Sequence, residues 1–299
     1  MRKSCIISVV SCCTQLAALV FMPALPVHGE DNRLKLDFRG EAHYSEYNFT
    51  DVVQPYEATD AWAELRIAYW LNEKGSLSPY LSIVPVGTTE SSFWWQRTVQ
   101  TEVGVQWYPF SKPPLQSIRL FVGIASRRYY DEPDHAAVQR ADTILGGDYY
   151  HDNLYNGDGF FTREPTLSIT WTSLAFRRTN FSQSDYKALL WAGNVKVGRN
   201  LRHGRSVFMP YVVADWCYVP KHDERWWENY LRAGAGVRWY PTTSRAGGFP
   251  AGDLARRSYV YAEILNNAAW LGVRPSSGDI ATTDFRLGVG FSTGGFLRE

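Results

Sequence analysis

The chain has 299 residues, with 31 basic and 30 acidic side chains and a formal net charge of +1. Because there is no sizeable basic excess to attract phosphates, no nucleic-acid partner is expected. Aromatic residues make up 15% of the chain, and most of them are tryptophan or tyrosine. These two residue types are enriched where a membrane meets water, since the ring is apolar and its polar atom stays wet.

Residues 1–29 have the pattern of a secretory signal peptide. Arg2 and Lys3 form a basic start, a largely apolar run follows, and small residues precede Glu30. We therefore expect cleavage before Glu30 and a mature chain, residues 30–299, that forms one β-barrel domain. Of the four cysteines, three lie in the signal segment, so the mature chain can form neither an intramolecular disulfide nor a multi-cysteine metal site.

The mature chain begins with a predicted strand whose two faces differ in polarity. Apolar or small residues at 34–44 alternate with five ionisable residues, Lys35, Asp37, Arg39, Glu41 and His43. A period of two indicates a strand, and five ionisable side chains on one face are too many for a packed core. This face is expected to line a water-filled lumen or an open solvent face.

Further strands are predicted, in chain order, at 61–71, 80–86, 94–107, 117–127, 166–177, 186–197, 207–219, 228–240, 258–268 and 284–292. The segment 129–162 is polar and rich in Asp, Gly, Tyr and Asn, and its alternation is weaker.

An aromatic motif occurs twice, at 94–109 and at 226–241: a tryptophan pair, eleven residues, then Trp-Tyr-Pro. Twelve strand steps between the tryptophans rise roughly 40 Å, or roughly 30 Å of height at a tilt of about 40°, which suits an apolar membrane band with its two aromatic girdles. A half-exposed strand of a soluble sandwich is the alternative. We assign to the membrane girdles Trp94, Trp95, Trp107, Tyr108, Trp226, Trp227, Trp239 and Tyr240.

The two copies of the motif also bear on the number of strands. If they are a true duplication rather than a coincidence, an even number of strand steps separates them, whereas five are visible. One further strand is therefore expected near 141–150. The predicted fold is an all-β, antiparallel transmembrane β-barrel of about twelve strands after a cleaved signal peptide, with both termini on the periplasmic side.

The predicted inner face supplies the candidate functional residues: Arg39, Glu41, Trp62, Glu64, Arg66, Trp70, Glu102, Glu228, Arg232, Arg238, Asp284 and Arg286. One interpretation is a lumen sealed by its own salt bridges. The other is a conduit or binding cleft, with Trp62 and Trp70 stacking on sugar rings while the charges hold hydroxyl groups or uronic carboxylates. Buried charges are costly unless they are paired with opposite charges or hydrated. The lumen must therefore be either filled by ion pairs or filled with water.

No sequence motif for catalysis, phosphate binding or metal binding is present. Oxygen-bearing residues gather at 148–158, but their spacing matches no calcium loop, and a solvated loop is the simpler interpretation. We expect no enzymatic activity, no cofactor and no metal. An outer-membrane enzyme acting on lipid or lipopolysaccharide is an alternative, and it would require a Ser–His pair on the outer wall.

Three segments resemble the C-terminal barrel of the bacteriophage adsorption protein A family: 103–110 (VGVQWYPF), Asp142 with 146–150 (GGDYY), and 230–241 (YLRAGAGVRWYP). That family is related in layout to barrels that export exopolysaccharide, and the resemblance covers about 95–292. It implies a porin-like outer-membrane barrel involved in secretion of surface polysaccharide. Family members carry a long periplasmic helical-repeat region before the barrel, whereas here the barrel is expected directly after the signal.

The expected function is a non-enzymatic component of polysaccharide export or cell-surface attachment in the cell outer membrane. A structural or adhesive barrel with a sealed lumen is a further alternative. The expected partners are outer-membrane lipids, the barrel-assembly machinery, a polysaccharide and a separate periplasmic export partner.

Overall fold

The computed structural model describes residues 33–47, 56–72, 76–89, 97–112, 115, 118–130, 140–149, 151–152, 167–179, 188–204, 206–218, 229–241, 258–270 and 283–292. Within these ranges every regular secondary-structure element is a β-strand. The described residues contain no helix that is long and apolar enough to cross a membrane. The expected signal peptide and its cleavage point lie outside the described residues.

The strands are β1 (Leu34–Tyr47), β2 (Tyr56–Tyr69), β3 (Leu77–Thr88), β4 (Thr98–Trp107), β5 (Ile118–Tyr129), β6 (Ala141–Tyr149), β7 (His151–Asp152), β8 (Leu167–Thr179), β9 (Ala188–Arg199), β10 (Leu201–His203), β11 (Ser206–Tyr218), β12 (Tyr230–Tyr240), β13 (Tyr259–Trp270) and β14 (Thr283–Ser292). Every pairing between them is antiparallel, which confirms the predicted all-β antiparallel architecture. The strand inferred at 141–150 from the aromatic repeat is β6.

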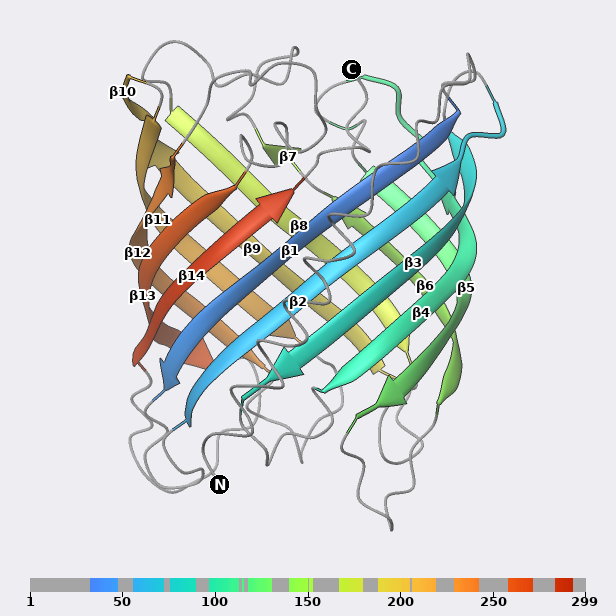
Figure 1. Ribbon diagram of the computed structural model, residues 1–299, viewed down its shortest axis with the longest axis horizontal. Helices are drawn as coiled ribbons and strands as arrows, with labels where there is room; N and C mark the ends of the chain where they lie inside the picture. Colours follow the sequence, from blue (N-terminus) through green and yellow to red (C-terminus); the bar gives the residue numbers. More distant parts are fainter. Residues whose placement is uncertain are drawn as a thin grey trace.

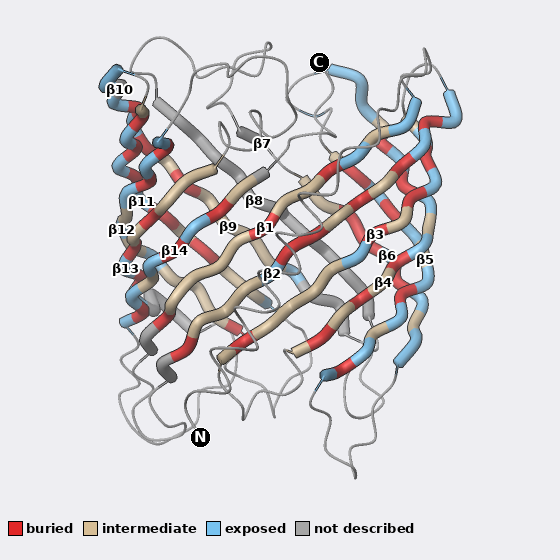
Figure 2. The backbone as a smooth tube through the Cα atoms, viewed as in Figure 1, coloured by how far each residue is buried: buried red, intermediate tan, exposed pale blue. Residues whose placement is uncertain are grey.

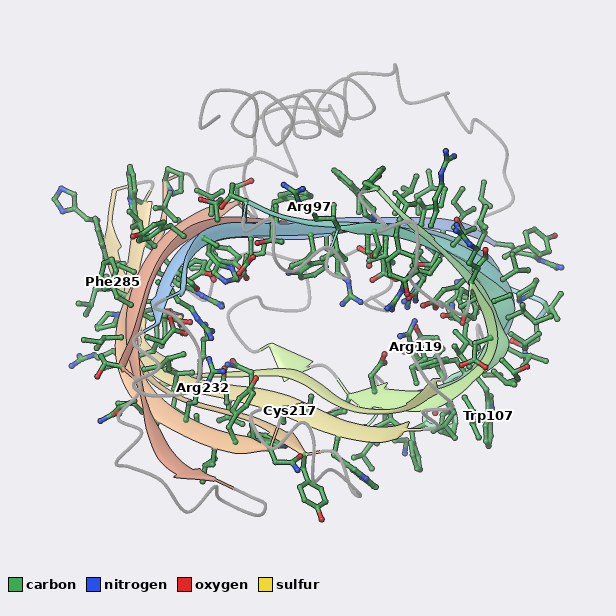
Figure 3. All side chains as sticks on the ribbon, turned by 90° about the horizontal axis from the view of Figure 1, so that it is seen from below. Arg97, Trp107, Arg119, Cys217, Arg232 and Phe285 are labelled. Atoms are coloured by element: carbon green, nitrogen blue, oxygen red, sulfur yellow. The ribbon has the colours of Figure 1, made fainter. Side chains whose placement is uncertain are left out.

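Strand pairing runs around the molecule and returns to its start. From β1 to β6 each strand pairs with the next, β6 pairs with β8, and β8 with β9. Strand β9 pairs in turn with β11, and the order continues through β12, β13 and β14 back to β1. Figure 1 shows the steep tilt of the strands, and Figure 3 shows the resulting elongated ring.

The β6–β8 contact is the narrowest part of this wall. It pairs only 145–147 with 176–178, whereas β1 and β2 pair over 14 residues. The short strand β7 extends the same edge by pairing His151 and Asp152 with β8. The short strand β10 adds three residue pairs to β11 and lies, like β7, at the end of the barrel where β1 begins and β14 ends (Figure 1).

The outer surface of the wall is apolar. Burial alternates along most of the strands whose burial is described (Figure 2), and the exposed members of the alternation are mostly large hydrophobic residues. Those at least 48% exposed within strands are Leu36, Val103, Val122, Ile124, Leu145, Val212, Ile264, Leu287 and Val289. Such a surface is unfavourable in water, but it suits contact with lipid chains.

The inner face carries the charged residues, so the usual distribution of a soluble protein is reversed. The buried charged residues are Asp37, Glu64, Arg66, Glu102, Arg119, Lys196, Asp215, Arg238, Glu263 and Asp284. Two apolar clusters also lie on the inward faces of their strands. One contains Val207, Met209, Tyr211, Val213, Tyr240 and Leu265, and the other Ala68, Tyr80, Phe121, Ala125 and Ile144.

Two of the girdle assignments are wrong. Tyr108 is 8% exposed and Tyr240 is 1% exposed, so neither reaches the outer surface. Alternation explains this, because each follows an outward-facing tryptophan and must therefore point inward. Trp107 and Trp239 are 47% and 40% exposed on the outer face, as a girdle position requires. The other girdle candidates, Trp94, Trp95, Trp226 and Trp227, lie outside the described residues.

A cross-strand glycine contact allows the Tyr80 ring to lie against the inner wall. Gly104 pairs with Tyr80 on β3 and with Gly123 on β5. A Cβ atom added at Gly104 would lie 2.3 Å from the Val122 carbonyl oxygen and 3.0 Å from the Tyr80 ring. The absence of a side chain is therefore what permits this close approach.

We predict that Gly104→Ala lowers the free energy of unfolding by about 1–3 kcal/mol, because overpacking forces the backbone to shift. The measurement is a denaturant titration of the refolded barrel. Gly87→Ala is the matched control, because a Cβ atom at Gly87 would meet nothing within 4 Å. Equal stability of the two variants would contradict this packing.

Candidate functional site in the barrel interior

The first inner network is centred on Glu64 of β2. Its carboxylate accepts hydrogen bonds from Arg39 Nε (2.8 Å) and Nη2 (2.6 Å), from Arg66, and from the Ser82 hydroxyl (2.8 Å). Arg39 is the direct cross-strand partner of Glu64, and Ser82 is that of Arg66. Strand alternation therefore puts all four side chains on one face, and register brings them into contact.

A second group lies beside it on β3, β4, β5 and β6. Arg119 forms a bidentate ion pair with Asp148, its cross-strand partner, and its guanidinium lies 4.9 Å from the centre of the Phe121 ring. The Gln106 amide donates to the Ser78 hydroxyl at 3.0 Å. On the same face of β4, the predicted lumen residue Glu102 is 5% exposed and accepts a hydrogen bond from Gln100.

The other inner network is centred on Glu263 of β13. Glu263 accepts from Lys196 Nζ at 2.8 Å, from the Tyr211 hydroxyl at 2.9 Å, and from Arg286 Nη1 at 3.4 Å. These partners come from β9, β11 and β14, so the network joins β13 to two strands that are distant in sequence and to its neighbour β14. Figure 3 shows Arg119 and Arg232 pointing inward from opposite ends of the ring, with Trp107 and Phe285 pointing outward.

Asp284, the second residue of β14, extends this network. It accepts from Arg232 Nη1 at 3.2 Å and from Arg286 Nε at 2.7 Å. Arg286 also lies 3.6 Å from an Asp215 carboxylate oxygen. The predicted lumen residues Arg232, Asp284 and Arg286 thus form one chain of ion pairs.

Glu41 connects β1 to the tyrosines of β13. The Tyr261 hydroxyl donates to Glu41 Oε1 at 2.5 Å, and the Tyr259 hydroxyl donates to Oε2 at 3.2 Å. His43 Nδ1 lies 3.5 Å from Glu41, and its Nε2 lies 3.9 Å from Asp60. A carboxylate placed among these groups is well satisfied without a bound ligand.

Arg238 differs from the other buried cations. It is 6% exposed, and its guanidinium lies 4.4 Å from the centre of the Tyr259 ring and 5.7 Å from that of Tyr211. Within the described part of the chain, no carboxylate lies within ion-pair distance of it, and its Nε has no hydrogen-bond partner. Glu41 attracts it only from beyond contact distance.

The two candidate tryptophans of β2 have different surroundings. Trp62 is 38% exposed on the inner face, directly opposite Glu41, with the Arg39 guanidinium 6.0 Å from its ring centre. Trp70 is 7% exposed and packs edge-on against Tyr108, with 5.5 Å between ring centres. Trp62 is therefore accessible to a solute, whereas Trp70 is part of the packing.

Eleven of the twelve lumen candidates fall within the described residues, and all of these lie on the inner face; Glu228 lies outside the described residues. Sequence reasoning missed Glu263, which accepts three hydrogen bonds at the centre of its network. The alternation of Tyr259, Tyr261, Glu263 and Leu265 against Val260, Ala262 and Ile264 was a usable signal for it.

The described residues contain no group of three or more His, Cys, Asp or Glu side chains that could hold a metal ion. Cys217 is partly buried on β11. Inside the barrel, the described residues thus offer paired charges, an exposed indole at Trp62 and a cation at Arg238 without a carboxylate in contact.

No known family model matches this chain, and no curated protein matches it in sequence. Its fold is similar to the translocator domain of the autotransporter NalP from Neisseria meningitidis, with 9% identity, 97% and 96% of the two chains covered, and a TM-score of 0.33. It is also similar to outer membrane phospholipase A from Escherichia coli (9% identity, 85% and 92% coverage, TM-score 0.41). A third is a bacterial polysaccharide outer membrane secretin (12% identity, 88% and 98% coverage, TM-score 0.36).

The names of these three proteins describe different activities, so the comparisons do not choose among functions. The membrane assignment follows from the chain itself, because its outer face is apolar and its inner face charged around a ring of paired strands. Only a structure that satisfies its backbone hydrogen bonds internally can have such a surface in lipid. The protein is an outer-membrane β-barrel, and its location is the cell outer membrane.

Proposed function

We propose that this protein is a twelve-stranded, signal-directed barrel that acts without catalysis as an outer-membrane component of polysaccharide export. The observation that carries the proposal is Trp62, an indole exposed inside the ring with a guanidinium beside it. Aromatic faces pack against the apolar faces of sugar rings, while nearby charges hydrogen-bond to hydroxyl groups.

The surroundings of Trp62 support this role. The neighbouring Glu41 and Arg39 are partly exposed as well, with side-chain exposures of 24% and 35%. They are therefore wet enough to exchange hydrogen bonds with a passing hydroxyl group, unlike the deeply buried Glu64. A surface of this kind favours weak, repeated contacts rather than tight binding, as transport requires.

The proposal of a non-enzymatic role is supported by the setting of His43. It lies on the inner face between two carboxylates, and within the described residues it has no hydrogen bond to a serine. A lipid hydrolase would need its nucleophile and base on the outer wall, where the substrate lies. Incubation of the refolded barrel with phospholipid and lipopolysaccharide should release no fatty acid, and measurable release would contradict the proposal.

A structural or adhesive barrel with a sealed lumen is the second candidate. It is favoured by the two ion-pair networks, since fully paired charges can fill a lumen without water. Planar bilayers distinguish the candidates. The export proposal expects a steady single-channel conductance from the refolded barrel, whereas a sealed lumen gives none.

We predict that Trp62→Ala weakens contact with a neutral sugar chain. Isomaltooligosaccharide added to one chamber should interrupt the current, and the dwell time of these events should fall about five-fold in the variant, corresponding to about 1 kcal/mol of aromatic contact. Trp107→Ala is the matched control, because Trp107 faces outward. Unchanged dwell times in Trp62→Ala would remove the observation on which the proposal rests.

A further inference from the structure

Arg238 is a buried cation with no carboxylate within ion-pair distance among the described residues, and Glu41 attracts it only from further away. Its side chain lies two residues before the end of β12, on the inner face. The other buried cations on this face have carboxylate partners: Arg66 pairs with Glu64, Arg119 with Asp148, and Lys196 with Glu263. Arg238 has none within ion-pair distance in the described part of the chain.

The tyrosines around Arg238 compensate for its burial only in part. Cation–π attraction to Tyr259 and Tyr211 is weaker than the cost of removing an ion from water. The hydroxyl groups of these tyrosines are already engaged, since Tyr259 donates to Glu41 and Tyr211 to Glu263. Among the described residues, the charge of Arg238 is therefore only partly compensated, and an added anion would be attracted to it.

The guanidinium is also placed to receive such a group. Its Nε is fully shielded and unpartnered, whereas neither Nη atom is among the fully buried polar atoms without a partner, and neither donates a hydrogen bond within the described residues. The two Nη groups thus remain available for a bidentate contact, which a planar carboxylate matches in geometry. The ring of Tyr240 packs against Tyr259 with 5.5 Å between ring centres and completes the aromatic cluster at this site.

We propose that Arg238 and the rings of Tyr211, Tyr240 and Tyr259 form a binding site for an oxyanion, specifically the carboxylate of an acidic sugar. The guanidinium holds the carboxylate, and the tyrosine side chains surround the ion pair. This inference rests on the proposed transport of saccharide, and it narrows the substrate class to chains that contain uronic acid.

The test uses thermal unfolding of the refolded mature barrel in detergent at constant ionic strength. Sodium glucuronate should raise the melting temperature of the wild-type protein in a saturable manner, because a ligand that binds only the folded state stabilises it. Glucose with sodium chloride should have no such effect. In Arg238→Met the glucuronate effect should be lost, and in Arg238→Lys it should weaken, since lysine cannot form the bidentate contact.

Lys35→Met is the matched control, because it removes one positive charge from the predicted inner face of β1 at the same end of the barrel. It should retain the full glucuronate response. An equal response in wild type and Arg238→Met would overturn the proposal, as would an equal response to glucose. Inorganic phosphate forms a second arm: an Arg238-dependent response to phosphate without one to glucuronate would overturn the assignment to a sugar acid.

The unliganded stability of Arg238→Met separates binding from packing. Removal of an unpaired buried charge should leave the melting temperature unchanged or raised. A marked fall would show that Arg238 serves mainly as a cation–π packing residue, against the proposal. If Arg238→Met does not fold, the Arg238→Lys variant and the wild-type glucose control still test whether the glucuronate response depends on Arg238 and on the carboxylate. Loss of conductance in bilayers would contradict transport without altering the glucuronate measurement, so the two failures are distinguishable.

Discussion

Replacing Glu64 with glutamine is expected to destabilise the barrel by about 3–5 kcal/mol, because the removal of one partner leaves buried charges uncompensated. Glu64 is the shared acceptor of Arg39 and Arg66, and its own side chain is 6% exposed. Arg66 is 8% exposed and has little access to water, whereas Arg39 is 35% exposed and can rehydrate in part. The larger share of the loss should therefore come from Arg66.

The measurement is a guanidinium titration of the refolded barrel, followed by tryptophan fluorescence and by the mobility shift of the folded form on gels. The triple variant Arg39→Met/Glu64→Met/Arg66→Met is the control, because replacement of a whole buried ionic group by apolar residues is often neutral. Most of the stability lost in Glu64→Gln should be regained in it. Wild-type stability of Glu64→Gln would mean that this network is wet and contributes little.

An arginine at Val103 is expected to cost about 2–4 kcal/mol in a lipid bilayer, because it places a charge on the lipid-facing surface near the middle of a strand. Val103 is 60% exposed, and its cross-strand partner Ile124 is 65% exposed. In a water-soluble sheet, the same substitution at such an exposed position would change stability by no more than about 0.5 kcal/mol.

The depth dependence of this effect provides the control. Leu34 is also exposed but is the first residue of β1, so Leu34→Arg should cost only about 0–1 kcal/mol near the membrane interface. Both variants are compared in phosphatidylcholine vesicles by denaturant titration. Equal effects at the two positions would contradict the membrane assignment.

The strands were predictable because alternation is a property of each segment taken separately. The charged face of 34–45 indicates β1, and the predicted strand at 284–292 corresponds to β14, which pairs with it. Even the poorly patterned β6 follows from the spacing of the aromatic repeat. The errors at Tyr108 and Tyr240 arose where a motif was treated as one aromatic block, although alternation turns adjacent residues to opposite faces.

The sequence alone was enough to show which side chains share the inner face, since that depends on a period of two within each strand. Contacts between them were decided by register, which aligns residues that are far apart in the chain: Arg39 with Glu64, and Lys196 with Glu263. Register also left Arg238 among tyrosine rings without a carboxylate. Only the tertiary structure could separate a paired charge from an unpaired one, because composition balances charges over the whole chain, whereas ion pairs form only at contact distance.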